Sequence, residues 1–145
     1  MEAAWETVMD GRKIRIYPGT EVHQETDGQP EANRFRKAEN NMSLPVVYAN
    51  MFIESGAEVL SEYQKLNGPA FHFVTVSDLR WNDDLSPWCH GAVMAKGEAF
   101  GGKADEYLDF FTGQVMPYAE EKVGNVSARI LAGYSMAGLF ALWAS

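Results

Sequence analysis

Near its end, the chain places a short turn between a strand-like run and a helix-like run, and this arrangement restricts the fold more than any other feature. An apolar run ends at Ala132 and is followed by Gly133-Tyr134-Ser135-Met136-Ala137-Gly138. Residues 139–144 are again almost entirely apolar and predict a helix. Small residues on both sides of Ser135 allow the strand and the helix to approach each other closely. The chain therefore predicts a sharp strand-to-helix turn centred on a serine.

A serine in such a turn has two interpretations. The turn would hold the Ser135 hydroxyl clear of the sheet, where it can attack a substrate. The segment matches G-x-S-x-A-G, so Ala137 stands where the full G-x-S-x-G pattern has glycine, a difference of one methyl group. In the alternative interpretation, Ser135 only caps the helix that follows. We take the nucleophile as the working hypothesis, because no other serine of the chain has such surroundings.

Length and composition predict one domain that covers residues 1–145. The chain has 145 residues, of which 46% are hydrophobic, enough for one core but not for two domains. The single cysteine, Cys89, excludes an internal disulfide and leaves no zinc-type spacing. We therefore expect neither a metal nor a cofactor.

Charge and hydropathy exclude two classes of partner. The formal net charge is −8, whereas nucleic-acid binding depends on clustered lysines and arginines. The apolar runs are far shorter than the roughly 20 residues that a membrane span needs, and the first residues lack the pattern of a signal peptide. We expect a cytoplasmic protein that binds neither nucleic acid nor membrane.

The first third of the chain predicts a hairpin followed by a long connection. Residues 5–9 and 12–17 flank Asp10-Gly11, a dipeptide typical of tight hairpin turns. Residues 20–43 are polar and contain few large apolar side chains, so we expect an exposed loop. His23 lies in this loop, where we expect it to be solvated.

The remainder alternates buried strands with helices. Strands are expected over residues 45–50, 70–76 and 126–132, where short apolar runs occur. A capping box of Ser55 and Glu58 predicts the start of one helix, and the pattern over residues 103–122 predicts another, kinked or divided by Pro117. The segment 77–102, between a strand and a helix, is expected to be a long loop.

Right-handed crossovers make the three later strands parallel. Ligands of such sheets bind beyond the carboxyl ends of the strands. One rim of the sheet is therefore expected to hold residues 50–54, the segment 77–102 and Ser135.

The chain resembles the N-terminal half of an α/β-hydrolase of the esterase type, the group that includes enterochelin-esterase-like and feruloyl-esterase-like enzymes. The resemblance covers Leu44 to Ser145 and rests on Pro45-Val46-Val47-Tyr48, on the stretch from Trp81 to Trp88 and above all on the turn at Ser135. It implies an α/β fold in which an antiparallel hairpin precedes parallel strands with crossover helices. It also implies hydrolysis of a small-molecule ester by the serine.

The resemblance further implies an oxyanion hole of backbone N–H groups. One donor would be Met136, the residue after the serine, and the other would be Met51 or Phe52 at the end of a strand. Both of the latter residues could equally be ordinary apolar packing. Three aromatic residues would form the rim of the substrate site or belong to the core: Trp81, Trp88 and Tyr134.

The other members of a catalytic triad are harder to place. In this fold the acid and the histidine follow the serine in chain order, whereas all three histidines of this sequence precede Ser135. His90 is the best-placed substitute because it lies in the expected rim loop. His72 is expected to be a partnered histidine of a buried strand.

Two other groups in this segment suggest alternative chemistry, a thiol nucleophile and a metal site. Cys89 lies beside His90, but neighbours in sequence seldom point at each other productively, so a thiol nucleophile is not expected. Asp83 and Asp84 match no metal-ligand spacing, and we expect them to be solvated.

The last helix is apolar on nearly all sides, as are helices that lie between two layers. Natural ends are usually polar and exposed, so we expect the chain to be a fragment with an open edge strand. Such an edge predicts self-association or strand exchange between copies. Two functions follow: a serine esterase whose acid and histidine lie outside this chain, or a catalytically inactive hydrolase-like fragment that acts as a binding or self-associating domain.

Overall fold

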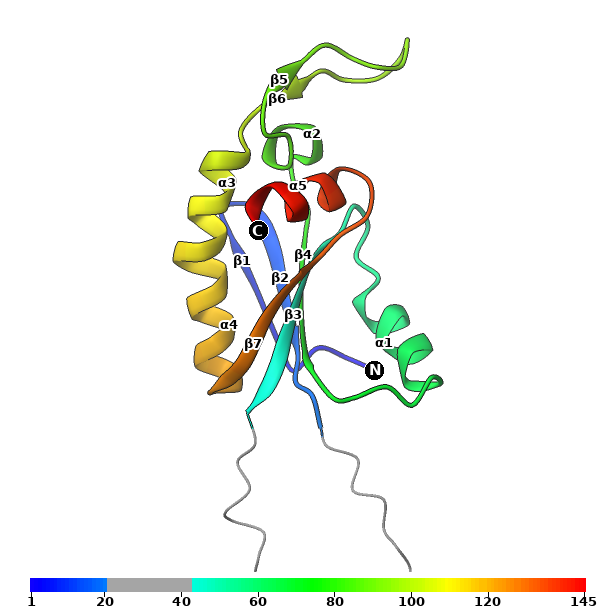
Figure 1. Ribbon diagram of the computed structural model, residues 1–145, viewed down its shortest axis with the longest axis vertical. Coiled ribbons are helices and arrows are strands. Elements are labelled where there is room, and N and C mark those ends of the chain that lie inside the picture. Colours follow the sequence, from blue (N-terminus) through cyan, green and yellow to red (C-terminus); the bar gives the residue numbers. More distant parts are fainter. Residues whose placement is uncertain (21–42) are drawn as a thin grey trace, which may run out of the picture.

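The computed structural model describes residues 1–20 and 43–145 (Figure 1). The loop expected over residues 20–43 falls almost wholly outside the described residues, and so does His23. None of the helices in the described part of the chain has the length and apolar content of a membrane span.

A five-stranded mixed sheet in the order β1-β2-β4-β3-β7 forms the centre of the fold. β1 pairs with β2 and β2 with β4 in antiparallel fashion, whereas β3 runs parallel to both β4 and β7. The predicted fold class is confirmed, because an antiparallel hairpin precedes parallel strands joined by helices. The strands are β1 (Trp5–Met9), β2 (Arg12–Tyr17), β3 (Leu44–Asn50), β4 (His72–Ser77) and β7 (Val126–Ala132).

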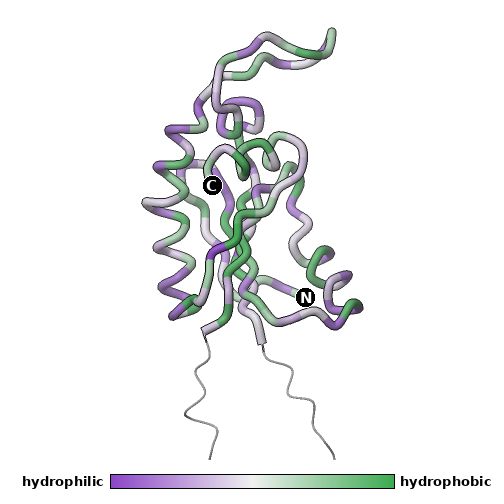
Figure 2. The backbone as a smooth tube through the Cα atoms, in the orientation of Figure 1, coloured by the Kyte–Doolittle hydropathy of each residue, from purple (hydrophilic) through white to green (hydrophobic). Residues whose placement is uncertain are grey.

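Helices cover both faces of this sheet (Figure 1). α1 (Gly56–Gln64) packs on one face, where its Leu60 contacts a cluster that includes Tyr17 and Phe73. On the other face a larger core forms around Tyr48 and Tyr107, among other residues. Hydrophobic residues accordingly concentrate along the central strands and polar ones on the outer sides of the helices (Figure 2). The helices of that second face are α3 (Ala104–Phe110), η2 (Phe111–Val115), α4 (Met116–Val123) and α5 (Met136–Ala144).

The helix predicted over residues 103–122 forms as three successive segments, α3, η2 and α4, and Pro117 lies near the start of α4. This proline stands at the second position of α4, and the five residues before α4 form the wider π-helical segment η2. A proline has no N–H to donate and its ring collides with the preceding turn of an α-helix. The wider turn accommodates the ring while the chain continues in the same direction.

The expected capping box at the start of α1 is wrong. The Ser55 side chain makes no capping hydrogen bond, and its hydroxyl lies 3.8 Å from the Met51 sulfur. The Glu54 carboxylate accepts the Gly56 N–H at 2.8 Å instead and also accepts the Thr75 hydroxyl at 2.7 Å. Glu54 replaces Ser55 as the cap because its two carboxylate oxygens bind the start of the helix and the sheet at the same time. The serine side chain is too short to do this.

The segment expected to be a loop over residues 77–102 contains secondary structure. α2 (Trp81–Asp84) follows β4 closely, and β5 (Cys89–His90) pairs with β6 (Phe100–Gly101) as a short antiparallel ribbon. The Cys89 thiol is exposed and donates to the Gly101 carbonyl at 3.2 Å. Elements this short have no periodicity from which a sequence could predict them.

A buried ion pair joins the N-terminal hairpin to α2. Arg12 donates to both carboxylate oxygens of Asp84, at 2.9 and 2.7 Å, and the side chains are 6% and 3% exposed. Asp84 also accepts the Arg80 N–H at 3.0 Å. The guanidinium lies over the rings of Tyr107 and Phe110 in α3, 5.4 and 4.8 Å from their centroids. The prediction that Asp84 is solvated is therefore wrong.

A second polar cluster ties α4 to the strands. Glu120 accepts two hydrogen bonds from Arg129 of β7, both at 2.7 Å, and one from the Tyr48 hydroxyl of β3 at 3.0 Å. The Arg129 guanidinium holds the pKa of Glu120 below its usual value. This cluster lies on the strand that leads directly into the serine turn, so it helps to place that turn.

Removing the carboxylate of the buried pair should destabilise the fold. For Asp84→Asn we expect a loss of about 3 kcal/mol in the free energy of unfolding, because Arg12 would remain buried without its main partner. The matched control is Glu62→Gln, which breaks the exposed pair with Lys65 and should cost less than about 1 kcal/mol. Urea denaturation followed by circular dichroism measures both, and equal losses in the two variants would contradict the prediction.

Candidate active site

Three segments meet at the carboxyl ends of the parallel strands. Asn50, the last residue of β3, is in register with Val76 near the end of β4, and Ala49 is in register with Ala132, the last residue of β7. The strands therefore end together. The residues after β3, the segment that leads into α2 and the turn after β7 consequently share one rim, as expected from the topology.

The Ser135 backbone adopts an unusual conformation between β7 and α5. Its φ of 52° and ψ of −128° lie in a region that residues with a Cβ rarely enter. The side chain is exposed and makes no capping hydrogen bond, although Ser135 stands directly before the first residue of α5. The plain capping interpretation of this serine therefore has no support in the geometry. Strain of this kind persists only where the surrounding structure imposes it.

A close backbone contact between Gly133 and the first turn of α5 accompanies this conformation. A Cβ on Gly133 would lie 2.2 Å from the Ala137 carbonyl oxygen and 2.7 Å from the Gly138 nitrogen. Only a residue without a side chain fits there, because both neighbours are backbone atoms that cannot move aside. Ala137 itself is fully buried, so its methyl group is accommodated in the core.

The amides expected to form an oxyanion hole differ in their availability. Met136 is the first residue of α5, and the first amides of a helix have no acceptor within that helix. The Met51 N–H donates to the Val76 carbonyl at 2.8 Å, so it is already engaged in the sheet. The Phe52 N–H instead points to the turn and donates to the Tyr134 hydroxyl at 3.1 Å. Of the two candidates at this strand end, Phe52 fits the donor better.

Two of the expected rim residues, Trp81 and Tyr134, form one aromatic cluster with Phe52. The Trp81 ring lies between the other two, with its centroid 5.3 Å from that of Phe52 and 5.8 Å from that of Tyr134. Phe52 and Tyr134 are 63% and 55% exposed, so both rings face solvent on their outer sides. The cluster connects the segment after β3, the start of α2 and the serine turn.

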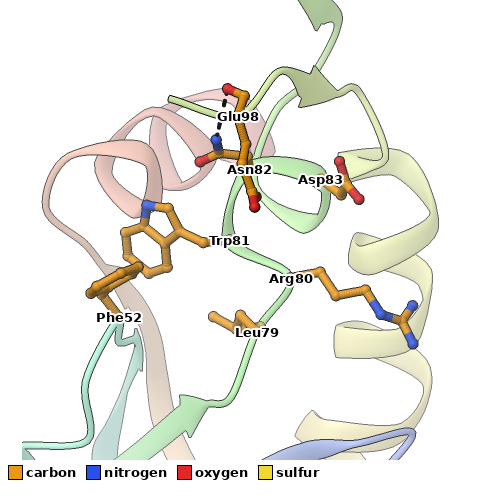
Figure 3. Close-up of a pocket in the computed structure, with 7 residues that line it drawn as sticks. All are labelled: Phe52, Leu79, Arg80, Trp81, Asn82, Asp83 and Glu98. Carbon is orange, nitrogen blue, oxygen red and sulfur yellow. Dashed lines mark hydrogen bonds between the residues drawn. The ribbon is translucent and has the colours of Figure 1, made fainter. Parts of the chain in front are cut away.

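A hollow of about 420 Å³ opens beside this cluster. Phe52 and Trp81 lie along one edge, Leu79 forms the floor, and Arg80 extends toward the opposite side (Figure 3). The Asn82 amide donates to the Glu98 carbonyl at 3.2 Å and closes one end. Leu79 and Arg80 were not among the expected site residues, although their place directly after β4 in the rim is a signal that the sequence contains.

Trp88 belongs to a different hollow. This second space of about 200 Å³ is mainly apolar and lies at the start of α5, where Met136 and Leu139 form part of its wall. His90 and Phe100 of the short ribbon form another part. The expected aromatic rim is therefore split between two hollows, one beside Phe52 and one beside Met136.

The two histidines among the described residues lie in different elements, His72 in β4 and His90 in the short β5-β6 ribbon. His72 is the first residue of β4, in register with Val46, so it lies at the end remote from Ser135. Its Nδ1 accepts the Gly19 N–H at 3.1 Å, and burial lowers its pKa, which keeps the ring neutral. It is a partnered histidine of a buried strand, as expected. His90 is exposed, and its Nδ1 lies 2.6 Å from the Gly91 carbonyl oxygen.

The described residues hold no group of three His, Cys, Asp or Glu side chains that could bind a metal ion. Asp84 is committed to Arg12, as described above. The Asp83 carboxylate instead lies against Gly101, where an added Cβ would be 2.2 Å from its Oδ1. The rim therefore offers a serine hydroxyl, backbone amides and aromatic side chains, with the charged side chains of Arg80, Asp83 and Glu98 along the larger hollow.

Comparison with known families identifies one match. A family model named Esterase, with the description "Putative esterase", matches residues 72–145. The matched stretch runs from β4 through α2 to the serine turn and α5. A search of curated proteins finds no match.

Solved structures of hydrolases are similar to this chain. The IroE-like serine hydrolase from Shewanella oneidensis is similar over 92% of this chain and 41% of its own, with a TM-score of 0.63 and 20% identity. The siderophore hydrolase EstA from Aspergillus nidulans is similar over 97% of this chain and 50% of its own, with a TM-score of 0.59 and 23% identity. The siderophore hydrolase EstB of the same organism is similar over 98% of this chain and 51% of its own, with a TM-score of 0.56 and 20% identity. The chain therefore spans about half or less of the length of these proteins, and the likeness shows the fold.

A methyl group at position 133 should disrupt the serine turn. For Gly133→Ala we expect a loss of about 2 kcal/mol in the free energy of unfolding, because the Cβ would overlap the backbone of α5. Gly113→Ala is the matched control, since a Cβ there meets nothing within 4 Å. It should be neutral or stabilising, because alanine favours helical backbone. Thermal unfolding followed by circular dichroism compares the two, and equal stability of the variants would refute the argument.

Proposed function

The chain belongs to this esterase family and has the α/β-hydrolase fold, and on that premise we propose that it hydrolyses small-molecule esters with Ser135 as the nucleophile. The observation that carries the proposal is the strained turn at Ser135. An exposed serine with a left-handed φ stands between the last described strand and a helix N-terminus, and its hydroxyl makes no capping bond. A turn of this shape presents a serine hydroxyl to substrate.

In the proposed reaction, the Ser135 oxygen attacks the ester carbonyl carbon while a base takes the serine proton. The carbonyl oxygen becomes an oxyanion, and we propose that the N–H groups of Met136 and Phe52 bind it. Collapse of this intermediate expels the alcohol, which takes up the proton, and leaves an acyl-serine. Water then attacks the acyl-serine in the same way and releases the carboxylic acid.

We propose that the base and its acid partner lie outside this chain, because all three of its histidines precede the serine and neither of the two described ones is placed to act as the base. His72 is at the wrong end of the sheet, and its Nδ1 already accepts the Gly19 amide. His90 lines the apolar hollow beside Met136, but its side chain is exposed and its Nδ1 is hydrogen-bonded to the carbonyl oxygen of the next residue, Gly91. In this fold the acid and the histidine follow the serine in the chain. On this view residues 1–145 are part of one hydrolase domain.

The substrate class follows from the rim rather than from the relatives. Two of the similar structures are siderophore hydrolases by name. Their sequences are only 23% and 20% identical to this chain, so the likeness shows a shared fold and not a shared substrate. The hollow beside Met136 is mainly apolar. The hollow beside Phe52 and Trp81 has an aromatic edge but is also lined by Arg80, Asp83 and Glu98. We propose a small-molecule ester whose apolar part packs on the aromatic side chains and whose polar part faces these charged residues, bound without a cofactor.

A fluorophosphonate probe tests the nucleophile directly. We expect intact-mass analysis to show one adduct on the wild-type chain and none on Ser135→Ala. Labelling should be slow, because removal of a triad member costs several orders of magnitude in rate. The matched control is Ser127→Ala, which removes an exposed hydroxyl from β7 and should keep the adduct. An adduct that survives in Ser135→Ala, or no adduct on the wild type after prolonged incubation, would contradict the proposal.

One observation favours a second function, self-association without catalysis. β7 is an edge strand of the sheet, bonded only to β3 among the described strands. Four consecutive residues in its middle are exposed, and Ile130 among them is 47% exposed. An exposed edge that carries apolar side chains is a template for pairing with another chain. We propose that a second copy of this chain pairs along β7 when no other partner covers it.

Charge on this edge should prevent the pairing. We expect the wild-type chain to show concentration-dependent dimers in sedimentation velocity and Ile130→Lys to remain monomeric, because a lysine on an edge strand opposes strand addition. Val8→Lys is the matched control, since Val8 is 60% exposed on β1, the opposite edge of the sheet. It should still form dimers. A monomeric wild-type chain, or a dimer that survives Ile130→Lys, would rule out β7 as the interface.

A further inference from the structure

We infer that the Tyr134 hydroxyl occupies the oxyanion-binding amide of Phe52 when the site is empty, so that an incoming acyl oxygen must displace it. The inference rests on the proposed function, because it assigns Phe52 the role of a donor. It adds a residue that controls access to that donor. Tyr134 precedes the nucleophile and acts through Phe52 rather than on the reacting atoms.

The contact itself is direct. The Phe52 N–H donates to the Tyr134 hydroxyl oxygen at 3.1 Å, a distance typical of a real hydrogen bond. An amide has one hydrogen, and an acceptor at this distance lies where a substrate oxygen would have to lie to use it. The phenol oxygen therefore stands in for the carbonyl oxygen of the substrate. The neighbouring Met51 amide offers no substitute, because it is bonded to the Val76 carbonyl.

The aromatic neighbours hold the phenol in this place without locking it. The Trp81 ring is tilted by 39° against Tyr134 and stands nearly edge-on to Phe52 at 77°. Such pairs favour one arrangement by about 1 kcal/mol. Tyr134 is nevertheless 55% exposed, so the ring can swing toward solvent without opening the core. A substrate oxygen that binds the Phe52 amide more strongly than the phenol does can therefore displace it.

The sequence context explains why the phenol reaches this amide. Tyr134 lies between Ala132, the last residue of β7, and the strained Ser135, and β7 is parallel to β3. The two strands end side by side, with Ala49 in register with Ala132. A long side chain just beyond the end of β7 thus arrives at the backbone just beyond the end of β3. A shorter residue at position 134 would leave the Phe52 amide open.

Tyr134→Phe tests the inference, because it removes the hydroxyl and keeps the ring. We expect the fluorophosphonate to label Ser135 about fivefold faster in this variant, the effect of one net hydrogen bond that the ligand no longer has to replace. A rate equal to or lower than that of the wild type would overturn the inference. A lower rate would mean that the hydroxyl assists the reaction, as a donor or as a support for the Phe52 backbone.

Tyr63→Phe is the matched control. The Tyr63 hydroxyl also makes one hydrogen bond, to the Pro69 carbonyl at 2.9 Å. Tyr63 belongs to α1, which lies far from α5 and the serine turn (Figure 1). The labelling rate of this variant should equal that of the wild type. A rate increase in Tyr63→Phe as large as that in Tyr134→Phe would show a general effect of losing a phenol and would overturn the inference.

Hydrogen exchange gives a second measurement that does not require a reactive serine. The chain has 8 phenylalanines, so labelling them with 15N leaves few amide signals to assign. We expect the Phe52 amide to exchange slowly in the wild type and about fivefold faster in Tyr134→Phe, because the hydrogen bond protects it. If neither chain is labelled by the probe, the proposed function fails while this measurement still decides the contact. Equal exchange in both chains would overturn the inference.

Discussion

The buried pair between Arg12 and Asp84 determines how the rim of this protein is built. It joins β2 to α2 across 72 positions of the chain, and the guanidinium also lies over the Tyr107 and Phe110 rings of α3. Three elements are therefore held by one charged group that cannot be left without its partner. Because Asp84 ends α2, this pair places the helix that begins with Trp81. The aromatic cluster of the rim depends on that position.

A close backbone contact sets the other half of the rim. Gly133 lies against the first turn of α5, and Ser135 nearby adopts a left-handed conformation. The strain is local, and burial of α5 after the turn, where Ala137 and Phe140 are fully buried, offsets it. The same geometry brings Tyr134 to the backbone after β3. The proposed nucleophile and the residue that we propose to cover the Phe52 amide thus belong to one turn.

The strands and most helices were predictable because each depends on a pattern within a few residues. Ile14 and Ile16 alternate with charged residues, and the short apolar run that ends at Asn50 is a buried strand. The capping box failed for a reason that local sequence does not contain. Glu54 is held by Thr75 of β4, and a carboxylate placed in this way binds the start of α1 better than Ser55. The prediction that Asp84 is solvated was wrong for the same reason, since its partner Arg12 lies 72 residues earlier in the chain.

By itself, the sequence determined the alternation of strands and helices, the serine turn and the rim on which that turn lies. These follow from hydrophobic periodicity, from glycines that permit close backbone approach and from the handedness of crossovers. Only the tertiary structure showed that the Met51 amide is bonded within the sheet whereas the Phe52 amide is not, separated Trp88 from Trp81 and paired Tyr134 with the Phe52 amide. Each of these depends on which hydrogen-bond partner or ring arrives from a distant segment. A pattern along the chain reports whether a side chain is buried, but the identity of its partner is decided when separate elements pack together.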